Sequence, residues 1–540
     1  MATPQQDSDA FDYIIVGAGS AGCVLANRLT ASGRHRVLLL EAGGEDTNPW
    51  IHVPIGYGRN IANAAVNWLY VSEPGKEWVR RPINQPRGKV IGGSSSINGM
   101  VYIRGQREDY DHWRQLGCTG WSYDDVLPYF MKSEDQQRGP SEYHGTGGPL
   151  AVSDPQESHP LADAFIAAAL AAGHKRNDDV NGAEQEGIGT IQWTIRNGRR
   201  CSAAVGYLKP VRGRANLAIA TEAHATKLLF EGRRAVGVEY RQGADLRTAR
   251  CRGEVLVSGG AINSPQLLQL SGLGPAALLR EHGIPVIADL TDVGENLQDH
   301  VNGPLMLRIN RPITGNDLFH SWGRRMIAGL RYGLLRKSLM ATGVTYAGGF
   351  FRADPNAASP DMQIQLMLFS ADVIGQEPHR WSGCTIVPAL MRPESRGYVR
   401  ILSPDPFVKP VFQPNYLTAQ KDRDVLLAGL KEARRIVAQP AFQAYVEAEY
   451  APGPAVQSDA DLVAYLLEKC RTSYHPVATC RMGIDDRAVV DPRLRVRGFE
   501  RLRIVDASIM PALVSGNTNA PTIMIGEKAA DMILDNAKAA

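Results

Sequence analysis

One histidine of the chain has a sequence context that suits proton transfer. His475 lies in the segment Ser-Tyr-His-Pro-Val. The following proline disfavours helical backbone at position 475 and restricts its conformation, as expected of a side chain held rigidly in a site. An imidazole titrates at a pH of about 6.5, so its neutral form can accept a proton at neutral pH. We therefore predict that His475 is a general base.

The chain has 12 histidines, and the contexts of the others are less specific. We expect His35 and His282 to lie at helix ends, His144 to lie in a turn and His300 to have a structural role. No set of His, Asp or Glu residues shows the spacing of metal ligands, such as H-E-x-x-H. We therefore predict no metal site.

A second group of residues is suited to holding phosphates. The apolar run Phe11–Val16 is followed by Gly17, Gly19 and Gly22, by a helical pattern, and by a second apolar run that ends at Glu41. In such a unit the first glycine permits the turn, the second lets the backbone approach a pyrophosphate, and the third lets helix and strand pack closely. The helix N-terminus attracts the phosphates, and the acid accepts bonds from ribose hydroxyls. The pattern predicts dinucleotide binding, and an acid at position 41 argues against NADP.

A glycine-dense segment from residue 86 to residue 105 follows. It contains Gly-Gly-Ser-Ser-Ser-Ile-Asn-Gly at 92–99, with apolar residues threaded through it. Such a composition is unsuited to a core strand. A loop laid against a large flat ligand, with backbone N–H groups facing it, explains both the small and the apolar residues.

Composition excludes several classes of protein. The 540 residues exceed one compact core, and 44% hydrophobic and 21% charged residues are ordinary for a globular enzyme. A net charge of +3 is far from that of a nucleic-acid-binding protein. The seven cysteines form no C-x-x-C pair, the polar N-terminus lacks a signal pattern, and no apolar run is long enough to cross a membrane. We expect a cytoplasmic protein whose membrane contact is at most peripheral, at the inner face.

The four motifs together resemble the glucose–methanol–choline (GMC) oxidoreductases. They are FDYIIVGAGSAGCVLANRL with VLLLEAG, the glycine–serine loop, VLVSGGAINSPQLLQLSGLGP, and the C-terminal SYHPVATCRMG with SGNTNAPTIMIGEKAADMI. The resemblance implies FAD and an α/β fold, α+β overall. A Rossmann-like FAD-binding domain is expected from residues 1–155, 200–300 and 472–540. A substrate domain with an antiparallel sheet is expected from residues 156–199 and 301–471.

The resemblance also carries site residues onto this sequence. It implies cofactor contacts along the phosphates, the ribose, the flavin loop, the adenine and the ribityl chain. These residues are Gly17, Gly19, Ser20, Ala21, Gly22, Glu41, Trp68, Val90, Gly93, Asn98, Gly99, Met100, Val101, Ala225, Asp506, Ala507 and Thr522.

The resemblance gives the chemistry a partner for His475. It implies that His475 and Asn519 act on an alcohol, with His475 taking the hydroxyl proton while hydride passes to flavin N5 and Asn519 binds the same oxygen. Ile97 stands where choline oxidase-like members attach FAD to a histidine. Isoleucine cannot form that bond, so we expect noncovalent FAD.

The substrate is less defined. We expect oxidation of a primary alcohol or polyol, such as a sorbose-like sugar or an aliphatic alcohol, with electrons passed to a quinone-like or dye-like acceptor. The alternatives are an oxidase that uses O2, a choline dehydrogenase, and an FAD-dependent lyase or photoenzyme.

The pattern of residues 320–337 predicts a helix with Trp322, Met326, Leu330 and Leu334 at four-residue spacing and several basic residues. We interpret it as an ordinary amphipathic surface helix, with a membrane-surface or quinone-docking face as the alternative.

Overall fold

The computed structural model describes residues 10–539. The polar N-terminal segment, in which no signal was expected, lies mostly outside the described residues. None of the helices within 10–539 is both long and apolar enough to pass through a bilayer.

A parallel sheet is built from three distant parts of the chain. Its strands run in the order β10, β2, β1, β13 and β25. Their core residues, such as Ile14, Leu39 and Val255, are fully buried, as strands covered on both faces require. The bounds are β1 Phe11–Val16, β2 Val37–Leu40, β10 Leu217–Ala220, β13 Asp245–Val257 and β25 Leu502–Ile504.

Two helices pack side by side at this sheet. Helix α1 (Ser20–Leu29) follows β1, and α14 (Asn519–Ala539) returns from the C-terminal end to lie against it. Strand β13 continues past the parallel sheet and pairs in antiparallel fashion with β12 (Arg234–Gln242), which pairs with β11 (Ala223–Glu231). Helix α7 (Gly260–Leu270) follows β13.

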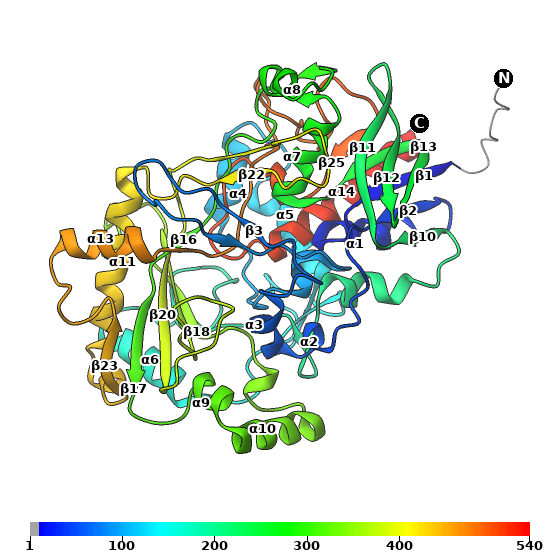
Figure 1. The fold of residues 1–540 in the computed structure, drawn as a ribbon. Helices are drawn as coiled ribbons and strands as arrows, with labels where there is room; N and C mark the ends of the chain where they lie inside the picture. The colour runs from blue at the N-terminus through cyan, green and yellow to red at the C-terminus, as the bar shows by residue number, and fades with distance from the viewer. Residues whose placement is uncertain (1–9, 540) are drawn as a thin grey trace, which may run out of the picture.

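A second sheet lies beside the first, and in Figure 1 it occupies the lower left. Its strands run β18, β19, β20, β16 and β24, and β17 joins β20 to β23, all antiparallel. Helices α6 (Pro160–Ala171) and α11 (Gln420–Val437) cover it. The bounds are β16 Val301–Asn302, β17 Leu305–Ile309, β18 Thr345–Phe351, β19 Met362–Met367, β20 Gly383–Leu390, β23 Val446–Ala451 and β24 Arg471–Thr472. A parallel sheet beside an antiparallel one confirms the predicted fold class.

Shorter elements connect and flank the two sheets. The helices among them are α2 Pro49–His52, α3 Tyr57–Asn60, α4 Arg107–Gln115, α5 Tyr123–Ser133, α8 Ala276–Glu281, α12 Pro440–Gln443 and α13 Asp459–Lys469. The strands among them are β3 Tyr70–Val71, β4 Asn84–Gln85, β5 Glu134–Gln136, β6 Leu150–Val152, β7 Gly187–Thr190, β8 Ile195–Arg196, β9 Arg199–Arg200, β14 Leu273–Gly274, β15 Ala288–Asp289, β21 Tyr398–Arg400 and β22 Val411–Gln413.

The glycine–serine segment is a buried loop with one 3-10 turn at Gly93–Ser96, not a core strand, as the sequence predicts. The helix expected at 320–337 is interrupted. The break falls only at its start: α10 (Trp322–Leu335) forms nearly the whole predicted helix, and the separate short helix α9 (Gly315–His320) precedes it. Ser321 lies between the two, and its hydroxyl caps α10 by accepting from the Arg324 N–H.

Candidate active site

One cavity joins the two sheets. It is lined at one end by the turn between β1 and α1, and at the other by His475 and by residues of the antiparallel sheet such as Met367. The predicted cofactor residues that line it are Gly17, Gly19, Ser20, Ala21, Glu41, Trp68, Gly93, Asn98, Gly99, Met100, Val101, Ala225, Asp506, Ala507 and Thr522. Gly22 and Val90 lie behind the wall. The structure therefore brings residues from six distant segments to one site.

The β1–α1 turn has the geometry that a pyrophosphate requires. Gly17 has φ +103°, which favours glycine, and a Cβ at Gly22 would lie 1.9 Å from the Gly17 carbonyl oxygen. At Gly19, by contrast, a Cβ would meet no atom within 4 Å, because this residue faces the cavity. The first turn of α1 has no side-chain cap, so its N–H groups are available to an anion.

Glu41 is buried beside this turn. Its carboxylate accepts hydrogen bonds from the N–H groups of Ala18 (2.9 Å) and Gly43 (2.8 Å). Burial nevertheless raises its pKa to about 7. A hydroxyl-rich ligand that donates to this carboxylate would favour its charged form, which fits an adenosine ribose.

The wall around Ile97 offers no good nucleophile. Ile97 itself lines the cavity, and the hydroxyls of the three preceding serines are engaged by the loop. Ser94 accepts from the Gly88 N–H (3.1 Å), Ser95 donates to the Gly92 carbonyl (2.6 Å), and Ser96 donates to the Ile91 carbonyl (2.8 Å). The residues thus fit FAD held by noncovalent contacts.

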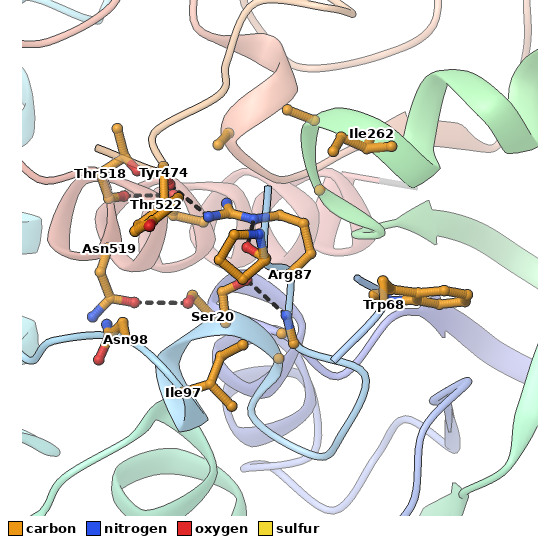
Figure 2. A pocket seen from close by; sticks show the side chains of 18 of the residues that line it. Ser20, Trp68, Arg87, Ile97, Asn98, Ile262, Tyr474, Thr518, Asn519 and Thr522 are labelled. Atoms are coloured by element: carbon orange, nitrogen blue, oxygen red, sulfur yellow. Dashed lines mark hydrogen bonds between the residues drawn. The ribbon is translucent and has the colours of Figure 1, made fainter. Parts of the chain in front are cut away.

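Asp506 and Trp68 have additional structural contacts. The Asp506 carboxylate accepts from the Gly260 N–H (2.9 Å) and the Ser264 hydroxyl (2.5 Å), so it holds the start of α7 against the cavity. Trp68 stacks on Tyr70 with ring centroids 5.9 Å apart. Figure 2 shows its ring at the edge of the cavity, away from Asn519.

His475 is almost fully buried, and its two ring nitrogens have different partners. Nδ1 lies 2.9 Å from Nδ1 of His300, and Nε2 lies 3.1 Å from Nδ2 of Asn517. The backbone N–H of His475 donates to Oδ1 of Asp299 (2.8 Å). The expected structural role of His300 therefore includes a direct contact with the candidate base, which its sequence context did not reveal.

These contacts define the tautomer of His475. Nε2 of His300 lies 3.3 Å from the carbonyl oxygen of Met391, and a carbonyl can only accept, so His300 carries its proton there. Its Nδ1 is then an acceptor, and Nδ1 of His475 is the donor. The lone pair of His475 therefore sits on Nε2, on the side of Asn517 and the cavity.

Both imidazoles are neutral in this environment. Burial lowers the pKa of His300 to about 3. Burial, together with the nearby Arg87 guanidinium, lowers the pKa of His475 well below its ordinary value. His475 is thus a neutral proton acceptor over a wide pH range.

The asparagine beside His475 is Asn517, not Asn519. Figure 2 shows Asn519 directed at Ser20, and its Oδ1 accepts from the Ser20 hydroxyl at 2.8 Å. Helix α14 begins at Asn519, so this side chain belongs to its first turn and faces α1. Oδ1 of Asn517 is buried without a partner. In this structure His475 therefore contacts Asn517, while Asn519 lines the same cavity and contacts Ser20.

Arg87 is a cavity residue that the sequence did not single out. Its Nη2 donates to the Tyr474 carbonyl at 2.6 Å, which fixes the residue before His475, and Figure 2 shows the guanidinium centrally in the site. Burial lowers its pKa to about 10, so it remains a cation at neutral pH.

Among residues 10–539, no group of three or more His, Cys, Asp or Glu side chains could hold a metal ion.

Comparisons with known proteins identify the family of this chain. Two models of the GMC oxidoreductase family match residues 11–302 and 393–526. The chain is 46% identical to an alcohol dehydrogenase [acceptor] of Pseudomonas putida over 97% of this chain and 96% of the relative, and 44% identical to the mitochondrial choline dehydrogenase of Homo sapiens over 98% and 90%.

Solved structures give the same result. Pyridoxine 4-oxidase from Mesorbium loti superposes with a TM-score of 0.88 at 32% identity, covering 96% of this chain and 98% of that one. A formate oxidase of Aspergillus oryzae, studied for its FAD modification, superposes with a TM-score of 0.93 at 28% identity, covering 99% and 100%. The chain belongs to the GMC oxidoreductase family and is an FAD-dependent oxidoreductase acting on CH–OH donors.

Proposed function

We propose that this enzyme oxidises primary aliphatic alcohols to aldehydes, with His475 as the base, and passes the electrons to an acceptor other than a nicotinamide. The observation that carries the proposal is the lone pair of His475 Nε2, which the His300 contact directs at a cavity shared with the β1–α1 turn. The similarity to an alcohol dehydrogenase [acceptor] supports the same reaction.

His475 and Asn517 have different roles at the substrate oxygen. An alcohol oxygen placed between them donates its proton to His475 Nε2 and accepts a hydrogen bond from Asn517 Nδ2. Removal of the proton raises the electron density on oxygen, and this drives hydride from the adjacent carbon. FAD, when bound, supplies the acceptor for that hydride. Asn517 orients the oxygen and stabilises its developing charge.

The wall of the cavity favours an aliphatic alcohol over choline. Apolar side chains of Tyr57, Ile61, Met367, Phe369 and Ile374 line this part. Of the described lining residues, only Glu41 and Asp506 carry carboxylates, and both already accept two or more hydrogen bonds from the protein.

The charges near His475 also favour an aliphatic alcohol over choline. Arg87 and Arg471 are the guanidinium groups of the wall, and their positive charge repels a quaternary ammonium. Few side chains are placed to hold the several hydroxyls of a polyol, since Asn302 donates to Ser473 (3.0 Å) and Gln365 accepts from Thr345 (2.8 Å).

We also propose the two domains at the boundaries predicted from the sequence.

The substrate class is tested by anaerobic mixing of the enzyme with alcohols while the flavin absorbance is recorded. We expect a medium-chain primary alcohol to bleach the flavin with a kcat/KM at least ~100-fold above that of choline, because like charges in the site cost several kcal/mol. L-sorbose should fall between the two. Equal rates with choline would contradict the substrate assignment, and no bleaching by any alcohol would favour the lyase or photoenzyme alternative.

The asparagine assignment is tested by a matched pair of variants. Asn517→Ala should lower kcat/KM by roughly 10²-fold, the usual effect of losing one donor to a developing oxyanion. Asn519→Ala, which loses only the bond to Ser20, should retain at least ten times the activity of Asn517→Ala. The reverse order, at equal FAD content, would restore Asn519 to the catalytic pair.

A variant of His300 tests whether its contact with His475 sets the tautomer of the base. His300→Leu removes the acceptor for His475 Nδ1 and should lower kcat roughly 10- to 100-fold with little change in KM. His300→Asn, whose Oδ1 can replace the lost nitrogen as an acceptor, should restore most of it.

The dependence of kcat/KM on pH distinguishes an effect of His300 on the tautomer of His475 from an effect on packing. Since the pKa of His475 is lowered, the wild-type kcat/KM should stay at its plateau down through pH 6.5, the ordinary value, and fall only below it. His300→Leu removes the acceptor of the His475 Nδ1–H bond, which favours the protonated imidazole, and should move this acidic limb to lower pH. An unmoved limb in the Leu variant would show that His300 acts through packing alone.

The noncovalent linkage is tested by denaturation. Because Ile97 and the engaged serine hydroxyls provide no attachment point, acid or heat precipitation should release all the FAD into the supernatant. Flavin fluorescence is measured in the supernatant and on a denaturing gel. Fluorescence that migrates with the polypeptide would show that another residue holds the flavin covalently.

A further inference from the structure

Helix α10 presents its apolar side to the solvent. With about 3.6 residues per turn, Trp322, Met326, Leu330 and Leu334 follow one side of the helix. Trp322 is 70% exposed and Leu334 is 82% exposed, and Ile327, Leu335 and the nearby Phe319 of α9 are exposed as well. These residues form what we name the α10 face: Phe319, Trp322, Met326, Ile327, Leu330, Leu334 and Leu335.

The side of α10 that packs on the protein is small. Ala328 and Tyr332 are its buried residues, and they lie roughly opposite Met326 and Leu330 around the helix. An ordinary amphipathic helix would turn the large apolar side chains inward. The interpretation of this segment as an ordinary surface helix is therefore wrong, because the polarity of α10 is reversed. Figure 1 shows α9 and α10 at the lower edge of the molecule.

Positive charge is concentrated on the same segment. Residues 311–337 contain six arginines and lysines against the single acid Asp317, whereas the whole chain has a net charge of only +3. Asp317 caps α9. Arg331 pairs with Glu157 at 2.6 Å, but within residues 10–539 Arg325 and Lys337 have no carboxylate partner.

The cations border the apolar stripe. Arg324 and Arg331 lie along one edge of it and Arg325 lies along the other, and Arg336 and Lys337 follow the end of the helix. Long basic side chains in this arrangement can extend to lipid headgroups while the aromatic and aliphatic residues enter the acyl boundary.

We propose that the α10 face binds the surface of an anionic lipid bilayer, with α10 lying in the plane of the headgroups. Exposed apolar residues, a tryptophan at the helix start, a basic border and the absence of acids from Trp322 to Leu335 are the properties of an interfacial helix. A second copy of the chain is a poorer occupant, because a symmetric contact would bring the two basic borders together.

The proposal is tested by flotation of the FAD-loaded enzyme with two kinds of vesicle. One contains phosphatidylglycerol mixed with phosphatidylcholine, and the other contains phosphatidylcholine alone. We expect binding at least tenfold stronger to the anionic vesicles, weakened by added salt, since each cation near such a surface contributes a factor of about five.

Two variants and a control separate the contributions. Trp322→Ser/Leu330→Ser/Leu334→Ser and Arg325→Glu/Lys337→Glu should each lose at least ~10-fold in binding to the anionic vesicles. Leu246→Ser/Leu402→Ser, which replaces exposed leucines far from α10 in the sequence, should bind as the wild type does. All should keep their thermal midpoint and their alcohol oxidation with a soluble dye, because these side chains are exposed and lie outside the cavity.

Two outcomes would overturn the proposal. One is unchanged vesicle binding by the triple serine variant. The other is a lipid-free dimer, seen by gel filtration, that the triple serine variant converts to a monomer while wild-type enzyme fails to float with the anionic vesicles. That result would assign the α10 face to a second copy of the chain.

Discussion

The buried carboxylate of Asp299 is the group on which the geometry of the site depends. It accepts hydrogen bonds from the Tyr416 hydroxyl (2.5 Å), the Thr472 hydroxyl (2.7 Å) and the N–H of His475 (2.8 Å). These bonds, a longer one from Gln85 Nε2 (3.3 Å) and the Arg87 charge reduce the cost of burying the carboxylate, although burial still raises the pKa of Asp299. Since the next residue is His300, one buried group sets the relative position of both imidazoles. Pairing of β16 with β24, with Val301 opposite Thr472, brings together the chain just before β16, where His300 lies, and the chain just after β24, where His475 lies.

Local patterns explain why the cofactor end of the site could be predicted from the sequence. The β1–α1 unit is contiguous, and the close contact that requires glycine at position 22 is with Gly17 of the same unit. The glycine–serine loop meets this unit at Gly93, where a Cβ would lie 2.7 Å from the Cα of Gly19. The catalytic end could not be predicted as fully. His300 and His475 are 175 residues apart and meet through strand pairing. No periodicity reports such a contact.

The contact of His475 with Asn517, on which the proposed role of Asn517 rests, was missed in the sequence for a different reason. Asn517 and Asn519 are two positions apart, and helix boundaries are uncertain by about that much when they are read from sequence. A helix that begins at Asn519 turns this side chain toward Ser20, while Asn517, in the preceding loop, faces His475. The amphipathic pattern of α10 was likewise visible in the sequence, but a pattern of apolar residues does not indicate whether the apolar side faces the core or the solvent. Only the burial of Ala328 and Tyr332 decides this.

The reversed polarity of α10 and the apolar wall of the cavity are connected along the chain. The segment after α10 leads to Val344, which lines the cavity and whose N–H donates to the Gly99 carbonyl at 3.1 Å. On the other side, His320 of α9 contacts the carbonyl of Pro378 (2.8 Å), in the same loop as the cavity residue Ile374. Aliphatic alcohols partition into bilayers because burial of each methylene is favourable. A lipid surface bound at α10 would therefore concentrate the proposed substrates close to segments that line the cavity with His475. Burial in this cavity wall also lowers the pKa of His475, which keeps the imidazole neutral as the proposed reaction requires.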